Sequence, residues 1–151
     1  MRELQQDEEG LIFRFFTEIG IIDQLATTAL ERMLPKSVTA AQFAILNHFV
    51  RLGLDSKSPF ELAKTMQVTR ATMSSTLKRM ERNGLVQITK DLEDGRAKNV
   101  RLTESGYEMR EACVKKTGEL AAQMPQALGL GELVRLTDAL QKVRIVLDQM
   151  R

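Results

Sequence analysis

Apolar residues recur every three or four positions near both ends of the chain, which is the spacing of one face of an α-helix. The N-terminal stripe runs from Phe15 to Met33 and ends before Pro35, a residue that cannot continue a helix. The C-terminal stripe has the steps of a heptad seam, which packs against another helix. Its members are Leu133, Leu136, Leu140, Val143, Leu147 and Met150. The pattern therefore predicts a long helix at each end, each with one apolar face.

Helix-start signals predict three shorter helices in the segment that follows Pro35. Thr39 and Gln42 have the spacing of a capping box, and Ser58 is followed by proline at the first helical position. Thr69 is the N-cap of the third helix. The predicted helix ends are Gly53, Met66 and Asn83-Gly84.

The period of the pattern changes from three or four to two after Gly84. Two segments, 86–89 and 99–102, alternate apolar with polar residues, and the polar loop between them contains Asp94-Gly95. This alternation predicts a β-hairpin. Thr103 opens another helix that we expect to last until Pro125. The predicted fold is mainly α with a small β-hairpin wing: a winged helix-turn-helix core flanked by long terminal helices.

The helix predicted over 69–83 has two chemically different sides. Met73, Leu77 and Met80 share the apolar side. The opposite side has small and hydroxylated residues near its start and cations toward its end, which suits a helix in the DNA major groove. An ordinary amphipathic helix with a solvated charged face is the alternative, but the short preceding helix and the following hairpin favour DNA reading. The outward residues are Ala71, Thr72, Ser74, Ser75, Lys78, Arg79 and Arg82.

Charge is unevenly distributed although the net charge is only +2. Residues 1–34 hold three basic and seven acidic side chains, whereas residues 69–101 hold eight basic and four acidic ones. The basic segment favours a polyanionic partner. Arg96 and Lys98 at the hairpin tip fit contact with the minor groove or the DNA backbone, and a merely soluble turn is the alternative.

Several classes of chemistry are excluded by residue counts. The single cysteine, Cys113, cannot form an internal disulfide, and with only one histidine a thiolate or imidazole metal cluster is not expected. Cys113 lies on an apolar stripe and is expected to be structural. No Gly-rich phosphate loop and no nucleophile with an orienting histidine occurs, so we expect neither an enzyme nor a cofactor. The polar start and the lack of a membrane-length apolar run predict a cytoplasmic protein without membrane contact.

The chain resembles the MarR (multiple antibiotic resistance regulator) family of winged helix-turn-helix transcription factors over nearly its whole length. The matching segments are VTAAQFAIL, VTRATMSSTLKRMERNGLV and DLEDGRAKNVRLTESG. Glu93 departs from the family pattern, because many members have an arginine there. By position, the resemblance places on the recognition helix and the wing tip Thr69, Arg70, Thr72, Ser74, Ser75, Arg79 and Arg96. The charge pattern adds Lys78 and Lys98 to these expected DNA contacts.

The resemblance also implies how the chain is organised. Residues 1–34 and 104–151 would be dimerisation helices, and residues 35–103 the DNA-binding domain, all in one intertwined domain. Many members are repressors that small, often aromatic, ligands release from DNA. Candidates for such a ligand site are Arg14, Phe16, His48 and Phe49, although for each of them the sequence favours a packing or surface role over ligand contact.

The resulting hypothesis is a homodimeric, sequence-specific regulator that binds a pseudo-palindromic operator in double-stranded DNA. We expect it to be a repressor that a small-molecule effector releases. The alternative is a winged-helix protein-interaction or dimerisation module without specific DNA binding.

Overall fold

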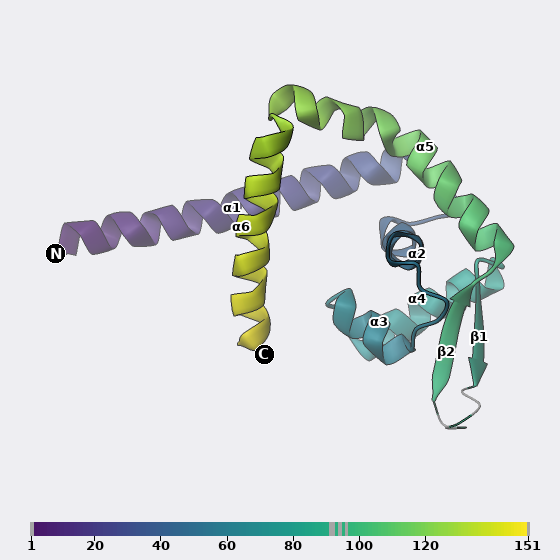
Figure 1. The fold of residues 1–151 in the computed structure, drawn as a ribbon. Helices are drawn as coiled ribbons and strands as arrows, with labels where there is room; N and C mark the ends of the chain where they lie inside the picture. Colours follow the sequence, from purple (N-terminus) through teal and green to yellow (C-terminus); the bar gives the residue numbers. More distant parts are fainter. Residues whose placement is uncertain (1, 91–92, 94, 96, 151) are drawn as a thin grey trace. The chain divides into compact units, whose positions relative to one another are not determined.

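The computed structural model describes residues 2–90, 93, 95 and 97–150 (Figure 1). The chain divides into two units, Met1–Lys115 and Lys116–Arg151, with the boundary inside one helix. The predicted division at 34/35 and 103/104, which separates dimerisation helices from a DNA-binding domain, stays a prediction. The elements are α1 (Arg2–Met33), α2 (Ala40–Leu52), α3 (Pro59–Thr65), α4 (Arg70–Arg82), β1 (Val86–Lys90), β2 (Lys98–Leu102), α5 (Glu104–Ala127) and α6 (Leu130–Gln149). This order confirms the predicted fold class.

The capping signals define the starts of α2 and α3. The Thr39 side chain accepts from the Gln42 amide while the Gln42 side chain accepts from the Thr39 amide. Ser58 and Glu61 make the same reciprocal pair, with Pro59 at the first position of α3. Helix α2 ends at Gly53, whose φ of 60° is the left-handed conformation that glycine adopts without strain.

Helices α3 and α4 form the predicted helix-turn-helix. The turn between them contains Gln67 with a φ of 57°, a conformation that side chains other than glycine seldom adopt. The Val68 amide then donates to the Ala63 carbonyl, which closes the turn. The Thr69 side chain accepts from the Thr72 amide and caps α4, as predicted.

The core lies where α2, α3 and α4 meet the hairpin (Figure 1). The predicted apolar side of α4 is buried, because Met73, Leu77 and Met80 are each at most 2% exposed. Cys113 of α5 is fully buried in the same cluster. The cluster also includes Ile45, Leu46, Phe49, Leu62, Leu85, Val86 and Val100.

The hairpin is fixed along both of its edges. Strands β1 and β2 are antiparallel with Ile88 opposite Val100. On the outer side of β2, Lys57 exchanges two backbone hydrogen bonds with Val100, at 3.0 and 2.9 Å. On the outer side of β1, the Ile88 amide donates to the Glu81 carboxylate of α4 at 3.1 Å. The hairpin is therefore held between the loop that precedes α3 and helix α4.

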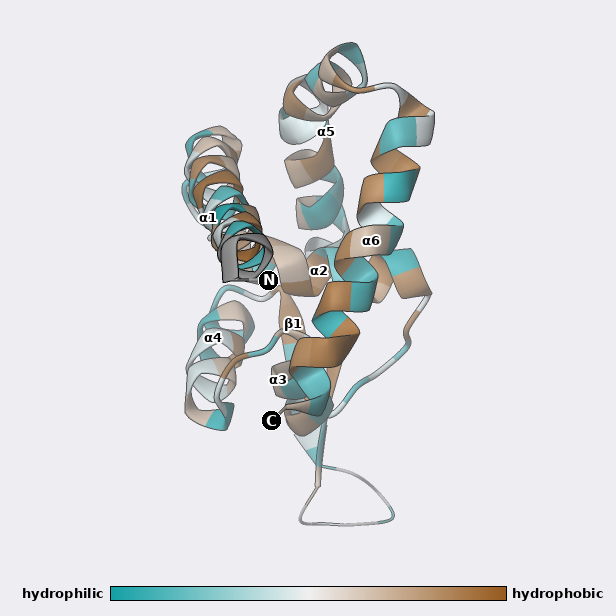
Figure 2. Ribbon diagram, turned by 90° about the vertical axis from the view of Figure 1, so that its left-hand side faces the viewer, coloured by the Kyte–Doolittle hydropathy of each residue, from teal (hydrophilic) through white to brown (hydrophobic). Residues whose placement is uncertain are grey.

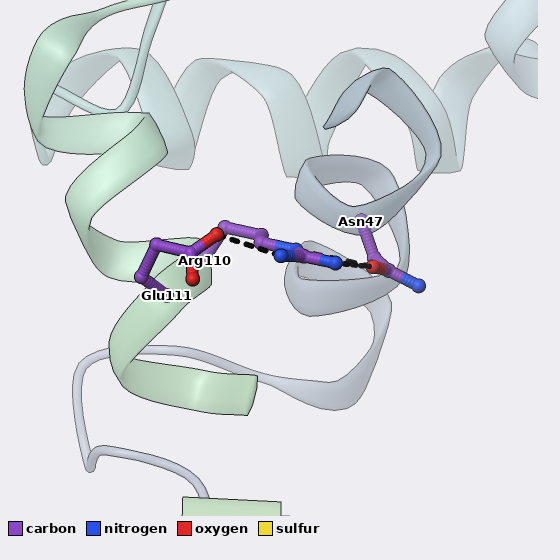
Figure 3. A network of polar contacts seen from close by, with 3 residues as sticks. All are labelled: Asn47, Arg110 and Glu111. Carbon is purple, nitrogen blue, oxygen red and sulfur yellow. Dashed lines mark hydrogen bonds and ion pairs between the residues drawn. The ribbon is translucent and has the colours of Figure 1, made fainter. Parts of the chain in front are cut away.

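Helix α5 is joined to the winged core at its first turns. Thr103 donates its hydroxyl to the Gly84 carbonyl and its amide to the Leu85 carbonyl, so the start of α5 is bonded to the end of α4. One to two turns later, Arg110 donates to the Asn47 side chain of α2 at 3.0 and 3.2 Å and pairs with Glu111 (Figure 3).

The expected end of α5 at Pro125 was wrong, because the helix continues to Ala127. Proline in the last turn removes one amide donor but leaves the following residues able to keep helical dihedrals. The Leu128 amide donates to the Met124 carbonyl, and α5 ends within one turn of the proline.

Large apolar side chains of α1 and α6 remain exposed in the single chain. Figure 2 shows that hydrophobic residues recur along both helices. Leu30 near the end of α1 packs against the core cluster, and Leu34, directly after the helix, is buried in it. No residue of α6 that the structure describes is buried. The exposed side chains of α1 include Leu11, Ile12, Phe13, Ile22 and Leu25, and those of α6 include Leu136, Leu140, Val146 and Leu147.

No helix in the described part of the chain is both long and apolar enough to cross a membrane.

Candidate nucleic-acid interface

Helix α4 presents one polar, cationic side to solvent. Burial of Met73, Leu77 and Met80 fixes the rotation of the helix, so the other side must face outward. All the expected contact residues on α4 are exposed; they are Arg70, Thr72, Ser74, Ser75, Lys78 and Arg79, together with the N-cap Thr69. The structure therefore brings seven predicted positions together on one continuous surface.

Hydroxyl groups near the start of α4 are partly ordered by local hydrogen bonds. The Thr69 and Thr72 hydroxyls are 2.9 Å apart, and the Arg79 guanidinium donates to the Ser75 hydroxyl at 3.2 Å. Short side chains at this end allow the backbone of a helix to approach base edges, while arginine reaches phosphates or guanine.

A groove of about 330 Å³ lies between α4 and the hairpin. Lys78 of α4, Lys90 of β1 and Lys98 of β2 all line it. Lys90 and Lys98 are directly opposite each other in the hairpin register. Like charges in that position destabilise a hairpin, and the three lysines outnumber the single carboxylate of the groove, that of Glu81. Glu81, Ser74 and Thr89 complete its polar lining.

Part of the expected wing contact lies outside the described residues. Arg96 is one of the residues on which the structure makes no statement. Lys98, by contrast, is exposed at the start of β2. Glu93, the departure from the family pattern, is also exposed.

Sequence reasoning missed two features of this surface. Lys90 was counted only as part of the basic segment, although the strand register that pairs it with Lys98 could have identified it. Glu81 was counted as an opposing charge, yet its carboxylate holds the Ile88 amide and so connects the recognition helix to the wing. No local sequence signal indicates the Glu81 contact, since it depends on how the strand packs against the helix.

The four candidate ligand residues fall into two environments. Arg14 and Phe16 are exposed on α1, where Phe16 packs edge-to-face against Phe15 at 5.4 Å. Phe49 is 1% exposed and is part of the core, and His48 is 8% exposed. Among the described residues, no hydrogen bond, ion pair or ring contact joins Arg14 or Phe16 of α1 to the two candidates on α2.

The surroundings of His48 disfavour its protonated form. Burial lowers its pKa from the ordinary value, and the nearby positive charges of Lys57 and Arg51 lower it further. The Lys57 ammonium lies 3.4 Å from Nε2, which a neutral imidazole can offer as an acceptor. Lys57 is also the residue whose backbone pairs with Val100, so the imidazole supports the root of the wing.

Metal ligation is not indicated in the described part of the chain. No group of three or more His, Cys, Asp or Glu side chains there lies close enough to hold an ion.

Comparison with known proteins agrees with this geometry. The "MarR family" model matches residues 36–97, which contain α2, α3, α4 and β1 and end directly before β2. The transcriptional activatory protein BadR of Rhodopseudomonas palustris is 27% identical over 142 residues, or 93% of this chain and 78% of BadR.

Two solved structures extend the similarity to the terminal helices. A mutant of MarR from E. coli, complexed with operator DNA, is 26% identical with a TM-score of 0.68, over 87% of this chain and 96% of that one. The organohalide-sensing regulator RdhR-CbdbA1625, in its ligand-free form, is 25% identical with a TM-score of 0.75, over 89% of this chain and 79% of that one. In its fold, in residues 36–97 and over most of the length of these relatives, the chain is similar to the MarR family of winged-helix transcriptional regulators.

Proposed function

We propose that the chain binds a pseudo-palindromic DNA operator as a homodimer, represses transcription there, and is released by a small aromatic ligand. The observation that carries the proposal is the outward side of α4, where hydroxyl groups and cations face solvent beside a groove with three lysines. The proposal is also supported by a similar protein, the E. coli MarR mutant, whose structure was solved in complex with operator DNA.

The exposed apolar surface of α1 and α6 supports the homodimer. Side chains such as Phe13 (74% exposed) and Leu25 (65%) on α1 are costly to leave in water. A second copy of the chain would cover them through a two-fold interface. Two-fold symmetry would then place one α4 in each of two successive major grooves, about one helical turn apart.

Ligand release would operate by a population shift. A ligand that binds more tightly to a dimer with a different spacing between its two α4 helices would lower the affinity for DNA. The relative described as organohalide-sensing supports an aromatic or halogenated ligand. Arg14, Phe16, His48 and Phe49 remain the proposed contacts.

Activation is the second candidate for the direction of regulation. It is favoured by one observation, that the similar protein BadR is described as a transcriptional activatory protein. A reporter gene placed behind the bound DNA segment separates the two: deletion of the regulator raises expression if it represses and lowers expression if it activates.

The proposal is tested by selecting genomic fragments that the purified chain retains, followed by affinity measurements on the enriched site. Arg79→Ala and Arg96→Ala should each weaken binding by about 1–3 kcal/mol if they contact bases, and less if they contact only phosphates. Small aromatic acids and phenols are then added to the complex, and release is expected with one class of them. Near-normal binding by both variants, or equal retention of all fragments, would contradict the proposed interface.

A further inference from the structure

Arg70, the first residue of α4, lies over the ring of Phe60 on α3. The guanidinium carbon is 4.4 Å from the ring centroid. Phe60 is the second residue of α3, and 53% of it is exposed, so the pair is on the surface. A cation at this distance is attracted by the electron-rich face of the ring, which restricts the side chain without changing its charge.

In the part of the chain that the structure describes, the Arg70 side chain contacts the Phe60 ring and not a carboxylate. The nearest acidic side chain in the sequence of α3, Glu61, is engaged by the Ser58 amide and hydroxyl at 3.0 and 2.8 Å. Arg70 forms no ion pair within the described ranges of the chain. A carboxylate partner would neutralise the guanidinium, whereas a ring leaves its full charge available for an anion.

Arg70 is therefore held where α4 begins. Thr69 caps one amide there, that of Thr72, and the amides of the first two residues have no partner inside the helix. The positive end of the helix dipole also favours an anion at this point. Charge, amide donors and dipole all favour a phosphate group at one place.

We infer that Phe60 is a positioning residue that holds the Arg70 guanidinium beside the N-terminus of α4 for a DNA phosphate. The inference rests on the proposed function, because it names a contact within the same interface. A phosphate contact carries no sequence information, so the effect of Phe60 should be similar on every duplex.

The test is fluorescence anisotropy of the full-length chain on a mixed-sequence duplex three helical turns long. Phe60→Leu keeps an apolar side chain but removes the ring, and it should weaken binding about two- to fivefold per bound protomer. Phe60→Tyr keeps the ring face and should bind as the wild type does. In an Arg70→Gln background, Phe60→Leu should cause no further loss.

Salt dependence separates positioning from a general loss of structure. Arg70→Gln removes a phosphate contact and should make the slope of log affinity against log salt shallower by about one per protomer. Phe60→Leu keeps the charge and should leave that slope unchanged.

Two results would overturn the inference while leaving the proposed function intact. One is a Phe60→Leu loss that is just as large in the Arg70→Gln background. The other is a Phe60→Leu variant that binds the duplex with wild-type affinity, although Arg70→Gln binds it weakly. A wild-type chain that binds no duplex at all would overturn the proposed function and this inference together.

Discussion

Gly106 is the glycine at which an added side chain would approach the backbone most closely. A Cβ atom built there would lie 2.2 Å from the Leu85 carbonyl oxygen, a backbone atom that cannot move without disturbing the hydrogen bond that it accepts from the Thr103 amide. We expect Gly106→Ala to lower the free energy of unfolding by about 1–3 kcal/mol, in the range seen for overpacked sites. Urea unfolding followed by circular dichroism measures this change.

The matched control for Gly106 is in the same helix. Gly118 has nothing within 4 Å of the position its Cβ would take. Gly118→Ala should therefore stabilise α5 by about 0.5–1 kcal/mol, because alanine is the better helix former. Equal effects of the two substitutions would contradict the tight junction between α5 and the end of α4.

His48 predicts the direction of a pH effect on stability. Its folded-state pKa is lowered by burial, then by Lys57 and Arg51, relative to about 6.5 in the unfolded chain. Above that value both states are neutral and the stabilisation is fully present. As the pH falls below it, the unfolded chain binds the proton more readily, and stability decreases until the folded pKa has been passed.

Replacing the sole histidine isolates this contribution. His48→Gln keeps an acceptor for the Lys57 ammonium but does not titrate. The wild type should lose stability between pH 7 and pH 5.5 more steeply than His48→Gln does, in thermal unfolding at matched ionic strength. Parallel pH profiles for the two proteins would refute the buried neutral imidazole.

At the scale of elements, the contact between α4 and β1 depends on one carboxylate. Glu81 accepts from the Ile88 amide, so Glu81→Ala should leave that donor without its partner and cost about 1 kcal/mol of stability. Glu81→Gln keeps an oxygen acceptor and should cost less. Because it also removes a negative charge from the helix that we propose to contact DNA, Glu81→Gln should bind duplex more tightly than the wild type, which the same anisotropy titration measures. Weaker binding by Glu81→Gln would count against contact between this side of α4 and DNA.

The attachment of α5 to α2 depends on Arg110 and Asn47. Arg110 makes two hydrogen bonds to Asn47, and its side chain is only 20% exposed (Figure 3). A double-mutant cycle of Arg110→Ala and Asn47→Ala should therefore give a coupling energy of about 1–3 kcal/mol. Glu111→Ala is the control, since that pairing is with an exposed neighbour and should contribute less than about 1 kcal/mol. Additive effects of Arg110→Ala and Asn47→Ala would show that the contact does not join the helices.

The elements were predictable where their signals are local. Thr39 with Gln42, Ser58 with Pro59, and Thr69 each define a helix start within four residues, and the structure confirms all three. Gln67 was not predictable in the same way, since its left-handed conformation is one that glycine or asparagine would normally signal.

Contacts between distant residues could not be predicted from the pattern. Arg110 and Asn47 are 63 residues apart, and the Lys57–Val100 pairing joins a loop to a strand. Such contacts depend on the packing of whole elements, which amphipathic periodicity specifies only as a face to be buried. The α4 surface was predictable because its apolar side alone fixes which residues point outward.

At the scale of the whole molecule, the seam of α6 predicts an oligomer. Leu140 is 43% exposed in the single chain, in the middle of that seam. Leu140→Glu should convert a dimer to monomer in sedimentation experiments and weaken DNA binding, because one half-site provides few contacts. Gln141→Glu adds the same charge one position away and should remain dimeric. A wild-type chain that sediments as a monomer would contradict the proposed assembly.

The most direct test of the proposed regulator is a hydroxyl-radical footprint on a genomic fragment that the chain retains. The account predicts two protected segments related by a two-fold axis, with centres about one helical turn apart, and loss of both in Arg79→Ala. A footprint without two-fold symmetry, or one that Arg79→Ala leaves unchanged, would contradict it.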